Sequence, residues 1–263
     1  MDAAADPYSY KEPLYRTGVA VGDYPVDHHH FRHPDWKSLP DLEFYPVPSF
    51  NVPLGSMIPK GVDDLIVAEK SISVSNLMNG ATRLQPVVMQ LGQAAGALAA
   101  LACIEDRNVR KIGIRQVQDE LLEAGCYIMP YLDLPKDDQH FKVLQRIGAT
   151  GILRGEGRNV GWSNETWFRA DDPLKGEDLH VAEFYGAIVI EPGEISVGRM
   201  LDLVRIYGGK IPSVSEEEWW NMLGLSDFDR SRTATRLEAA VVIDAAFDPF
   251  RMFDVDYKGR FRM

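Results

Sequence analysis

The sequence predicts an α/β portion in residues 1–130 and a small all-α helical domain in residues 131–263. A short apolar run, Leu65–Ala68, lies between turn residues, which is typical of a buried parallel strand. A long run of apolar and very small residues follows from Pro86 to Ala102 and predicts a buried helix. Proline and acidic residues are concentrated in 130–138, and amphipathic helical patterns follow, so we place a domain boundary there.

The first elements are expected to be extended. Leu14–Val26 contains glycine turns and is interpreted as an extended or looped segment. The prolines and aromatic residues of 34–50 argue against a helix in that stretch. Phe50–Ile58 is expected to be a strand with a bend, and Pro59–Asp64 is expected to be a turn.

The stretch Asn76–Ala102 is the most informative part of the chain. Residues 76–86 are polar and contain glycine, so they are interpreted as a loop that ends where Pro86 begins a helix. Apolar residues on all sides predict that this helix is buried. Gly92 and Gly96 weaken a helix, which suggests that another group comes close to its backbone. Close helix–strand or helix–helix packing explains these small residues equally well.

Arg83 directly precedes the expected helix N-terminus. Free N–H groups and the positive end of the helix dipole favour an anion or an electron-rich ligand at this position. A buried arginine is costly unless it meets an anion or another acceptor. The two interpretations are contact with a ligand or substrate, and a salt bridge within the fold.

The later elements are expected to be helical, with one long loop between them. The loop is expected over Gly155–Leu174. Helices are expected over Ile112–Ala124 with Gly125 as its C-terminal cap, over Gln139–Leu153, over Ile195–Tyr207, from Ser215 onward, and from the capping box at Thr235 to about Phe247.

Composition excludes several classes of partner. A net charge of −11 argues against nucleic acid and anionic membrane surfaces. No membrane span is expected, since Val87–Ala102 is shorter than the roughly 18 residues required and contains Gln90 and Gln93. Cys103 and Cys126 are interpreted as buried thiols.

The first residues, Met1–Asp6, have neither the basic nor the apolar region of a signal peptide. By Tyr15 the sequence already has the character of a fold interior. We therefore expect the chain to be the back portion of a larger protein.

A histidine cluster and its two acidic neighbours offer titratable groups: His28, His29, His30, His33, Asp23 and Asp27. Zinc sites need a fourth ligand at a defined spacing, and none is evident, so no metal site is predicted. Imidazole suits proton transfer near neutral pH, which makes one or two of these histidines candidates for a catalytic role. Structural or surface histidines are the alternative.

The segment Gly155–Gly161 superficially resembles a dinucleotide-binding fingerprint. Its spacing is one residue too long, and it follows an expected helix where the fingerprint follows a strand. A solvent-exposed loop is the preferred interpretation.

Four motifs together resemble a known family: Asp23–His29, Ser56–Ala68, Arg83-x-x-Pro86 and Gly92-Gln-Ala-Ala-Gly96. Over residues 14–125 the chain resembles the C-terminal part of the FAD-dependent oxidoreductases whose members are often labelled xanthan lyases. The resemblance implies an incomplete Rossmann-like FAD-binding fold, in which the strand near Leu65–Ala68 returns to the FAD sheet. It also implies hydride transfer between flavin and an unknown, carbohydrate-derived or other small-molecule substrate.

The resemblance also implies roles for particular residues. The proposed catalytic residues are His28, His29 and Arg83. The proposed cofactor-binding residues face the isoalloxazine and ribityl chain, and they are Asn79, Gly80, Thr82, Arg83, Pro86, Gly92, Gln93, Ala94 and Ala95. The fingerprint for the FAD pyrophosphate is absent from the sequence, so FAD binding is expected only with an upstream portion or partner chain. Many relatives are exported, so an exported or periplasmic location is expected.

Residues 137–249 resemble S-layer-homology repeats in two places, His140–Gly155 and Thr235–Ala240. Surface anchoring, docking and oligomerisation are the roles that this resemblance leaves open. A different class of function is a non-catalytic polysaccharide or cell-wall binding module, and a third is a polysaccharide lyase. Exposed tryptophans would favour the binding module, because aromatic faces stack on sugars; the four concerned are Trp162, Trp167, Trp219 and Trp220.

Overall fold

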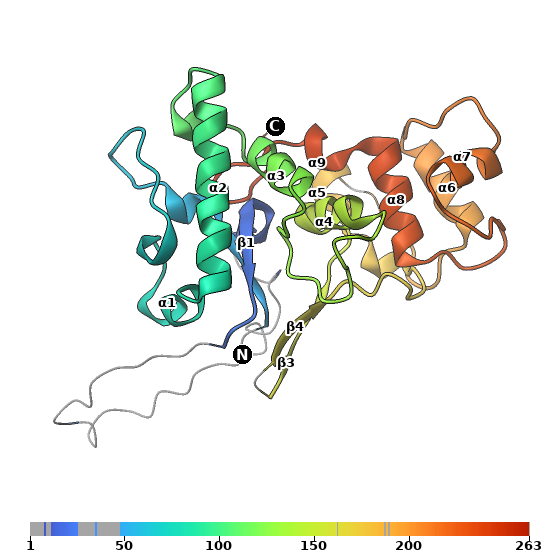
Figure 1. Ribbon diagram of the computed structural model, residues 1–263. Coiled ribbons are helices and arrows are strands. Elements are labelled where there is room, and N and C mark those ends of the chain that lie inside the picture. Colours follow the sequence, from blue (N-terminus) through green and yellow to red (C-terminus); the bar gives the residue numbers. More distant parts are fainter. Residues whose placement is uncertain are drawn as a thin grey trace. The chain divides into compact units, whose positions relative to one another are not determined.

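The computed structural model describes residues 8, 12–25, 35, 48–161, 163–186, 188 and 190–262 (Figure 1). The chain forms two compact units, and neither is continuous in sequence. Unit 1 contains residues 1–130, 156–166 and 255–260. Unit 2 contains residues 131–155, 167–254 and 261–263.

Unit 1 is built around one long helix and a pair of strands. Strands β1 (Gly18–Gly22) and β2 (Phe50–Pro53) pair antiparallel, with Val21 opposite Asn51. Figure 1 shows β1 beside helix α2 (Gln85–Ile104), with which it is in contact. The remaining helices of this unit are α1 (Asn76–Thr82), α3 (Ile114–Glu123) and the 3-10 helices Leu14–Thr17, Leu54–Met57, Glu69–Ser71 and Val109–Lys111.

Several sequence predictions for unit 1 are confirmed. Helix α2 has proline in its first turn, as expected for Pro86. Helix α3 ends before Gly125, whose φ of +72° is the left-handed conformation that a C-terminal glycine supplies. The segment 18–22 is extended, and β2 bends into a 3-10 helix at Leu54.

Other predictions for unit 1 are wrong. Residues 76–82 form helix α1, because the hydroxyl of Ser75 accepts a hydrogen bond from the amide of Met78 at 3.1 Å and caps the helix. Leu65–Ala68 is not a strand, and Leu65 is 44% exposed. Of its amides, that of Val67 bonds to the carbonyl of Met57 at 2.8 Å, but no described strand lies alongside to form a ladder.

Helix α2 is buried on one face only, which corrects the expectation that it is buried all round. The inward residues are Val87, Val88, Leu91, Ala94, Leu98 and Ala102. Met89 is 73% exposed and Ile104 is 79% exposed. No described residue of unit 1 covers this second face.

The sequence estimate of the length of α2 is also too short. The helix has 20 residues with a mean hydropathy of 1.8, and 28% of its 18-residue apolar window is buried. By length and composition alone, it is the one described helix that could cross a membrane. Core helices of soluble proteins meet the same criteria.

The segment expected to be a loop over Gly155–Leu174 contains a hairpin. Strands β3 (Glu156–Val160) and β4 (Ser163–Trp167) pair, and Gly161 lies between them with a φ of +62°. Asn164 and Thr166 of β4 are buried, so polar side chains face inward here. The alternation of apolar and polar residues that normally identifies a strand is therefore missing.

Unit 2 is mainly helical. Its helices are α4 (Phe141–Thr150), α5 (Ala182–Tyr185), α6 (Val197–Ile206), α7 (Glu216–Met222), α8 (Arg236–Phe247), α9 (Pro249–Met252) and the 3-10 helix Gly176–Asp178. The predicted caps are confirmed: Ser215 caps α7, and Thr235 with Glu238 forms a capping box on α8. Arg146 of α4 forms an ion pair with Asp244 of α8, which joins the two central helices.

Candidate functional site

The candidate site is the junction of α1 and α2, where the sequence placed most of its site residues. Helix α1 ends at Arg83, whose amide donates to the carbonyl of Asn79 at 3.1 Å. Leu84 then turns to an extended conformation, with φ −72° and ψ 145°, and serves as the N-cap of α2. A leucine side chain has no acceptor, so no side chain caps the first N–H groups of α2 from this position.

Arg83, which directly precedes this N-cap in the chain, is half-buried. Within the described part of the chain, no residue accepts a hydrogen bond from it or forms an ion pair with it. A partly desolvated arginine with free donors is suited to an electron-rich group. The alternative of a salt bridge within the fold therefore has no support among the described residues.

Two of the predicted cofactor-binding side chains donate hydrogen bonds to backbone carbonyls of unit 1. The amide nitrogen of Asn79 donates to the carbonyl of Lys70 at 3.2 Å. The hydroxyl of Thr82 is buried and donates to the carbonyl of Met78 at 3.1 Å. Gly80 and Ala94 are also buried, whereas Pro86 is exposed and Ala95 is half-buried. The cofactor assignment of these residues stays a prediction.

Gly92, Gln93 and Gly96 lie on the open face of α2. A Cβ added at either glycine would find no atom within 4 Å. The expectation that another group approaches these glycines closely is therefore not met within the part of the chain that the structure describes. Among the described residues, none covers the surface at these two glycines.

A side chain that the sequence analysis did not single out fixes the first turns of α2 to the sheet. The Oε1 atom of Gln90 accepts from the amide of Val21 at 2.9 Å, and its Nε2 atom donates to the carbonyl of Val21 at 3.0 Å. The side-chain amide of Gln90 thus bonds to both backbone groups of Val21, as a neighbouring strand would. One signal was available: a glutamine in an otherwise apolar helix is usually hydrogen-bonded.

The histidine candidates lie outside the described residues. His28, His29, His30, His33 and Asp27 belong to that part, and Asp23 is described and exposed. In the described ranges, no group of three or more histidine, cysteine, aspartate or glutamate side chains is arranged to hold a metal ion. Proton transfer by His28 or His29 stays a prediction.

The two cysteines are both free, and one prediction about them is wrong. Cys103 is exposed near the end of α2, where the open face continues. Cys126 is half-buried, and burial raises the pKa of its thiol above the ordinary value. The surroundings of Cys126 therefore disfavour its reactive thiolate form.

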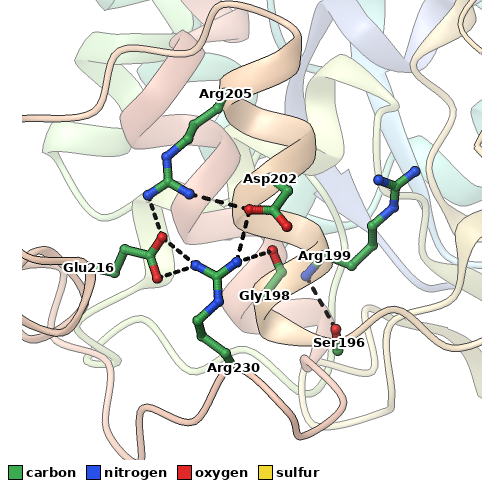
Figure 2. Close-up of polar contacts among 7 residues, drawn as sticks. All are labelled: Ser196, Gly198, Arg199, Asp202, Arg205, Glu216 and Arg230. Atoms are coloured by element: carbon green, nitrogen blue, oxygen red, sulfur yellow. Dashed lines mark hydrogen bonds and ion pairs between the residues drawn. The ribbon is translucent and has the colours of Figure 1, made fainter.

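Unit 2 contains a connected set of charged side chains, drawn in Figure 2. Arg230 donates to Glu216, to Asp202 at 2.9 Å and to the carbonyl of Gly198 at 3.4 Å, while Arg205 also pairs with Glu216. Burial raises the pKa of the Glu216 carboxyl, but hydrogen bonds from Arg230 and Arg205 outweigh it, so the pKa lies below the ordinary value. The four charges balance one another, and we interpret the set as a structural link between α6 and α7.

Of the described tryptophans that were candidates for sugar stacking, two are buried and one is exposed. Trp219 and Trp220 are 4% and 0% exposed, and the indole N–H of Trp220 donates to the carbonyl of Ser226 at 2.8 Å. Trp167 is 36% exposed, and Trp162 lies outside the described residues. The burial of Trp219 and Trp220 counts against the polysaccharide-binding interpretation.

Gly155–Gly161 runs through strand β3 and leads into β4. A dinucleotide fingerprint requires a helix N-terminus at this position to receive the pyrophosphate. The resemblance of this segment to such a fingerprint therefore carries no binding site.

Comparison with known proteins gives one match. Residues 9–121 match the family model described as FAD dependent oxidoreductase. The matched region contains β1, β2, α1 and α2, together with nearly all of α3, and it includes the α1–α2 junction. No curated protein and no solved structure matches the chain. The family match supports a flavin-linked redox function with FAD as the cofactor; it carries nothing for xanthan lyase or S-layer homology.

Proposed function

We propose that this chain supplies the flavin-facing C-terminal part of an FAD-dependent oxidoreductase. The remaining FAD-binding portion lies upstream, in the same polypeptide or in a partner chain. The observation that carries the proposal lies inside the region that matches the family. Among the described residues, none pairs with the guanidinium of Arg83, and Arg83 directly precedes the N-cap of α2, which has no side-chain cap. When bound, FAD supplies hydride transfer to or from a substrate.

The donor set at the α1–α2 junction fits an electron-rich ring edge. Arg83 presents up to five N–H donors, and the first turn of α2 adds backbone donors and the positive end of the helix dipole. Pro86 exposes no N–H of its own and leaves the approach to this turn open. We assign to Arg83 the binding and orientation of flavin or substrate, with Gly92 and Gln93 lining the adjoining open face.

The pyrophosphate requires a different part of the protein. Within the described ranges, the one glycine-rich candidate is the β3 segment, and no helix follows it. We therefore assign pyrophosphate binding to the upstream portion. That portion also covers the apolar face of α2.

Proton transfer accompanies hydride transfer to or from a hydroxyl or carbonyl substrate. We assign it to His28 or His29, because imidazole exchanges protons near neutral pH. The substrate class that we propose is a carbohydrate-derived small molecule, since the family resemblance points there.

Visible spectroscopy tests the proposal. The chain is expressed alone and joined to the open reading frame immediately upstream, and the purified proteins are scanned for flavin absorbance. We expect flavin only in the joined protein. A joined, folded protein without flavin would refute the proposal.

A variant pair tests the role of Arg83. We expect Arg83→Ala to weaken flavin retention in the joined protein about tenfold, the effect of losing a charged hydrogen-bond donor. The matched control is Arg107→Ala, which removes an arginine just beyond the C-terminus of α2 that pairs with Glu105 at 3.1 Å. Equal retention in the two variants would remove Arg83 from the site.

A further inference from the structure

A short C-terminal tip, Val255–Arg260, belongs to unit 1, although the residues on both sides of it belong to unit 2. The tip is a tight turn. The amide of Asp256 donates to the carbonyl of Arg260 at 2.9 Å, and the amide of Gly259 donates to the carbonyl of Asp256 at 2.8 Å. The carboxylate of Asp256 also accepts the amides of Lys258 at 2.8 Å and Arg260 at 3.0 Å.

The tip contacts the segment that leads into β1. Arg260 forms a two-pronged ion pair with Glu12, at 2.9 Å from Nε and 2.6 Å from Nη2. The carbonyl of Gly259 accepts from the guanidinium of Arg16 at 3.3 Å. Gly259 has a φ of +76°, and an added Cβ would overlap the carbonyl of Pro13. Only glycine therefore allows this approach.

The tip also contacts two further segments of unit 1, at Gly55 and Arg110. The hydroxyl of Tyr257 donates to the carbonyl of Arg110 at 3.4 Å, and its ring lies against Gly55. Three segments far apart in the sequence are thus held by six residues. The segment 12–17 continues directly into β1, whose Val21 is paired with Gln90 of α2.

We propose that the C-terminal tip is a latch that holds the segment 12–17 and, through it, the β1–Gln90 contact at the first turns of α2. When the latch is released, the segment 12–17 is held by fewer contacts. The contact between β1 and α2 at Val21 and Gln90 then opens more often. When the latch is closed, the contact between β1 and α2 stays rigid. This device is independent of the proposed flavin chemistry, because its test needs no cofactor.

Amide hydrogen exchange on the full chain tests the latch. The reporters are the amides of Leu14 and Arg16, which bond to the carbonyls of Glu12 and Pro13, and the amide of Val21. We expect Arg260→Ala to accelerate exchange at all three about threefold, and Gly259→Ala to accelerate it at least tenfold.

Two matched controls separate the latch from general effects of substitution. Arg262→Ala removes an arginine of similar exposure that pairs with Asp254 at 3.3 Å in unit 2. Gly125→Ala places alanine at a φ of +72° where nothing lies within 4 Å of the added Cβ, so it imposes the same backbone strain without the overlap. The proposal would be overturned if the amide of Val21 exchanged no faster in Arg260→Ala and Gly259→Ala than in their respective controls. Arg260 is 57% exposed, so its variant retains the fold and keeps the test decisive.

Discussion

Helices α2 and α8 are both long, alanine-rich and apolar, yet their surroundings differ. Helix α8 is enclosed within unit 2: Ala239, Ala240 and Val242 are each 0% exposed. Helix α2 buries one face in unit 1, whereas on its other face Met89, Gly92 and Gly96 are exposed and no described residue covers them. An apolar pattern on all sides thus predicts that a helix will be covered, but it does not say which part of the polypeptide covers it.

The two helix N-termini differ in the same way. The first three N–H groups of α8 all have acceptors: Arg236 and Leu237 donate to the carbonyls of Asp172 and Ala170, and Glu238 donates to the hydroxyl of Thr235. The carboxylate of Glu238 in turn accepts the amide of Thr235. The N-cap of α2, Leu84, provides no side-chain acceptor, and none of the described residues pairs with the guanidinium of the preceding Arg83. Helix α8 is thus capped within its unit, whereas among the described residues no side chain caps α2.

The largest expected effect comes from placing a charge on each helix. Ala240→Glu buries a carboxylate in the core of unit 2, and we expect it to lower the free energy of unfolding by more than about 3 kcal/mol. Ala100→Glu, on the exposed face of α2, is expected to change it by less than about 0.5 kcal/mol. Urea titration of the chain measures both; similar losses would contradict the contrast between covered and open helices.

Removing the cap of α8 has a smaller expected effect. Thr235→Ala eliminates the hydroxyl that accepts the amide of Glu238 at 3.2 Å, and we expect a loss of about 1 kcal/mol. Thr235→Ser, which keeps the acceptor, is the control. Equal unfolding midpoints for the alanine variant and the unchanged chain would show that the cap contributes nothing.

The glycines of α2 provide a test with opposite signs. Gly92→Ala and Gly96→Ala are each expected to stabilise the chain alone by about 0.5–1 kcal/mol, because alanine favours a helix and nothing described obstructs its methyl group. In the protein joined to its upstream portion, the same methyl groups are expected to reduce flavin retention. Thermal unfolding and the flavin spectrum measure the two effects, and unchanged retention would show that the open face is not tightly covered.

The smallest expected effect concerns pH. The pKa of Glu216 is lower in the folded state than in the unfolded state, so its contribution to stability is present above the unfolded pKa and is lost as the pH falls through the folded pKa. Glu216→Gln should flatten this acid dependence. The pKa of the Asp244 carboxyl is raised by burial and therefore affects the acid dependence in the opposite direction. Because Asp244 is present in both proteins, the difference between Glu216→Gln and the unchanged chain reports on Glu216 alone. An identical acid dependence in both proteins would exclude Glu216 as its source.

Features set by a few neighbouring residues were predictable from the sequence. The start of α8 follows from Thr235 and Glu238, and the end of α3 follows from Gly125, because caps act through local hydrogen bonds and backbone conformation. Helix α1 could have been found by the same logic, since Ser75 is its cap. Glycine and asparagine within 76–82 pointed to a loop, and the Ser75 cap outweighed that preference.

Features that depend on distant partners were not predictable. Leu65–Ala68 has the composition of a buried strand but has no described strand to pair with, and β3–β4 pairs without an apolar alternation. For the candidate site, the sequence identified Arg83 and its position before a helix. It missed the pairing of Gln90 with Val21, because nothing in the sequence shows which backbone lies opposite a side-chain amide.

The discontinuity of unit 1 has an evolutionary consequence. Residues 156–166 and 255–260 are parts of this unit, so a gene segment ending at Pro130 would not encode it completely. Recombination that moved residues 1–130 into another gene would leave behind the hairpin and the residues that contact Glu12 and Arg16. The two units are therefore expected to be inherited together, and neither is a cassette that can be exchanged by itself.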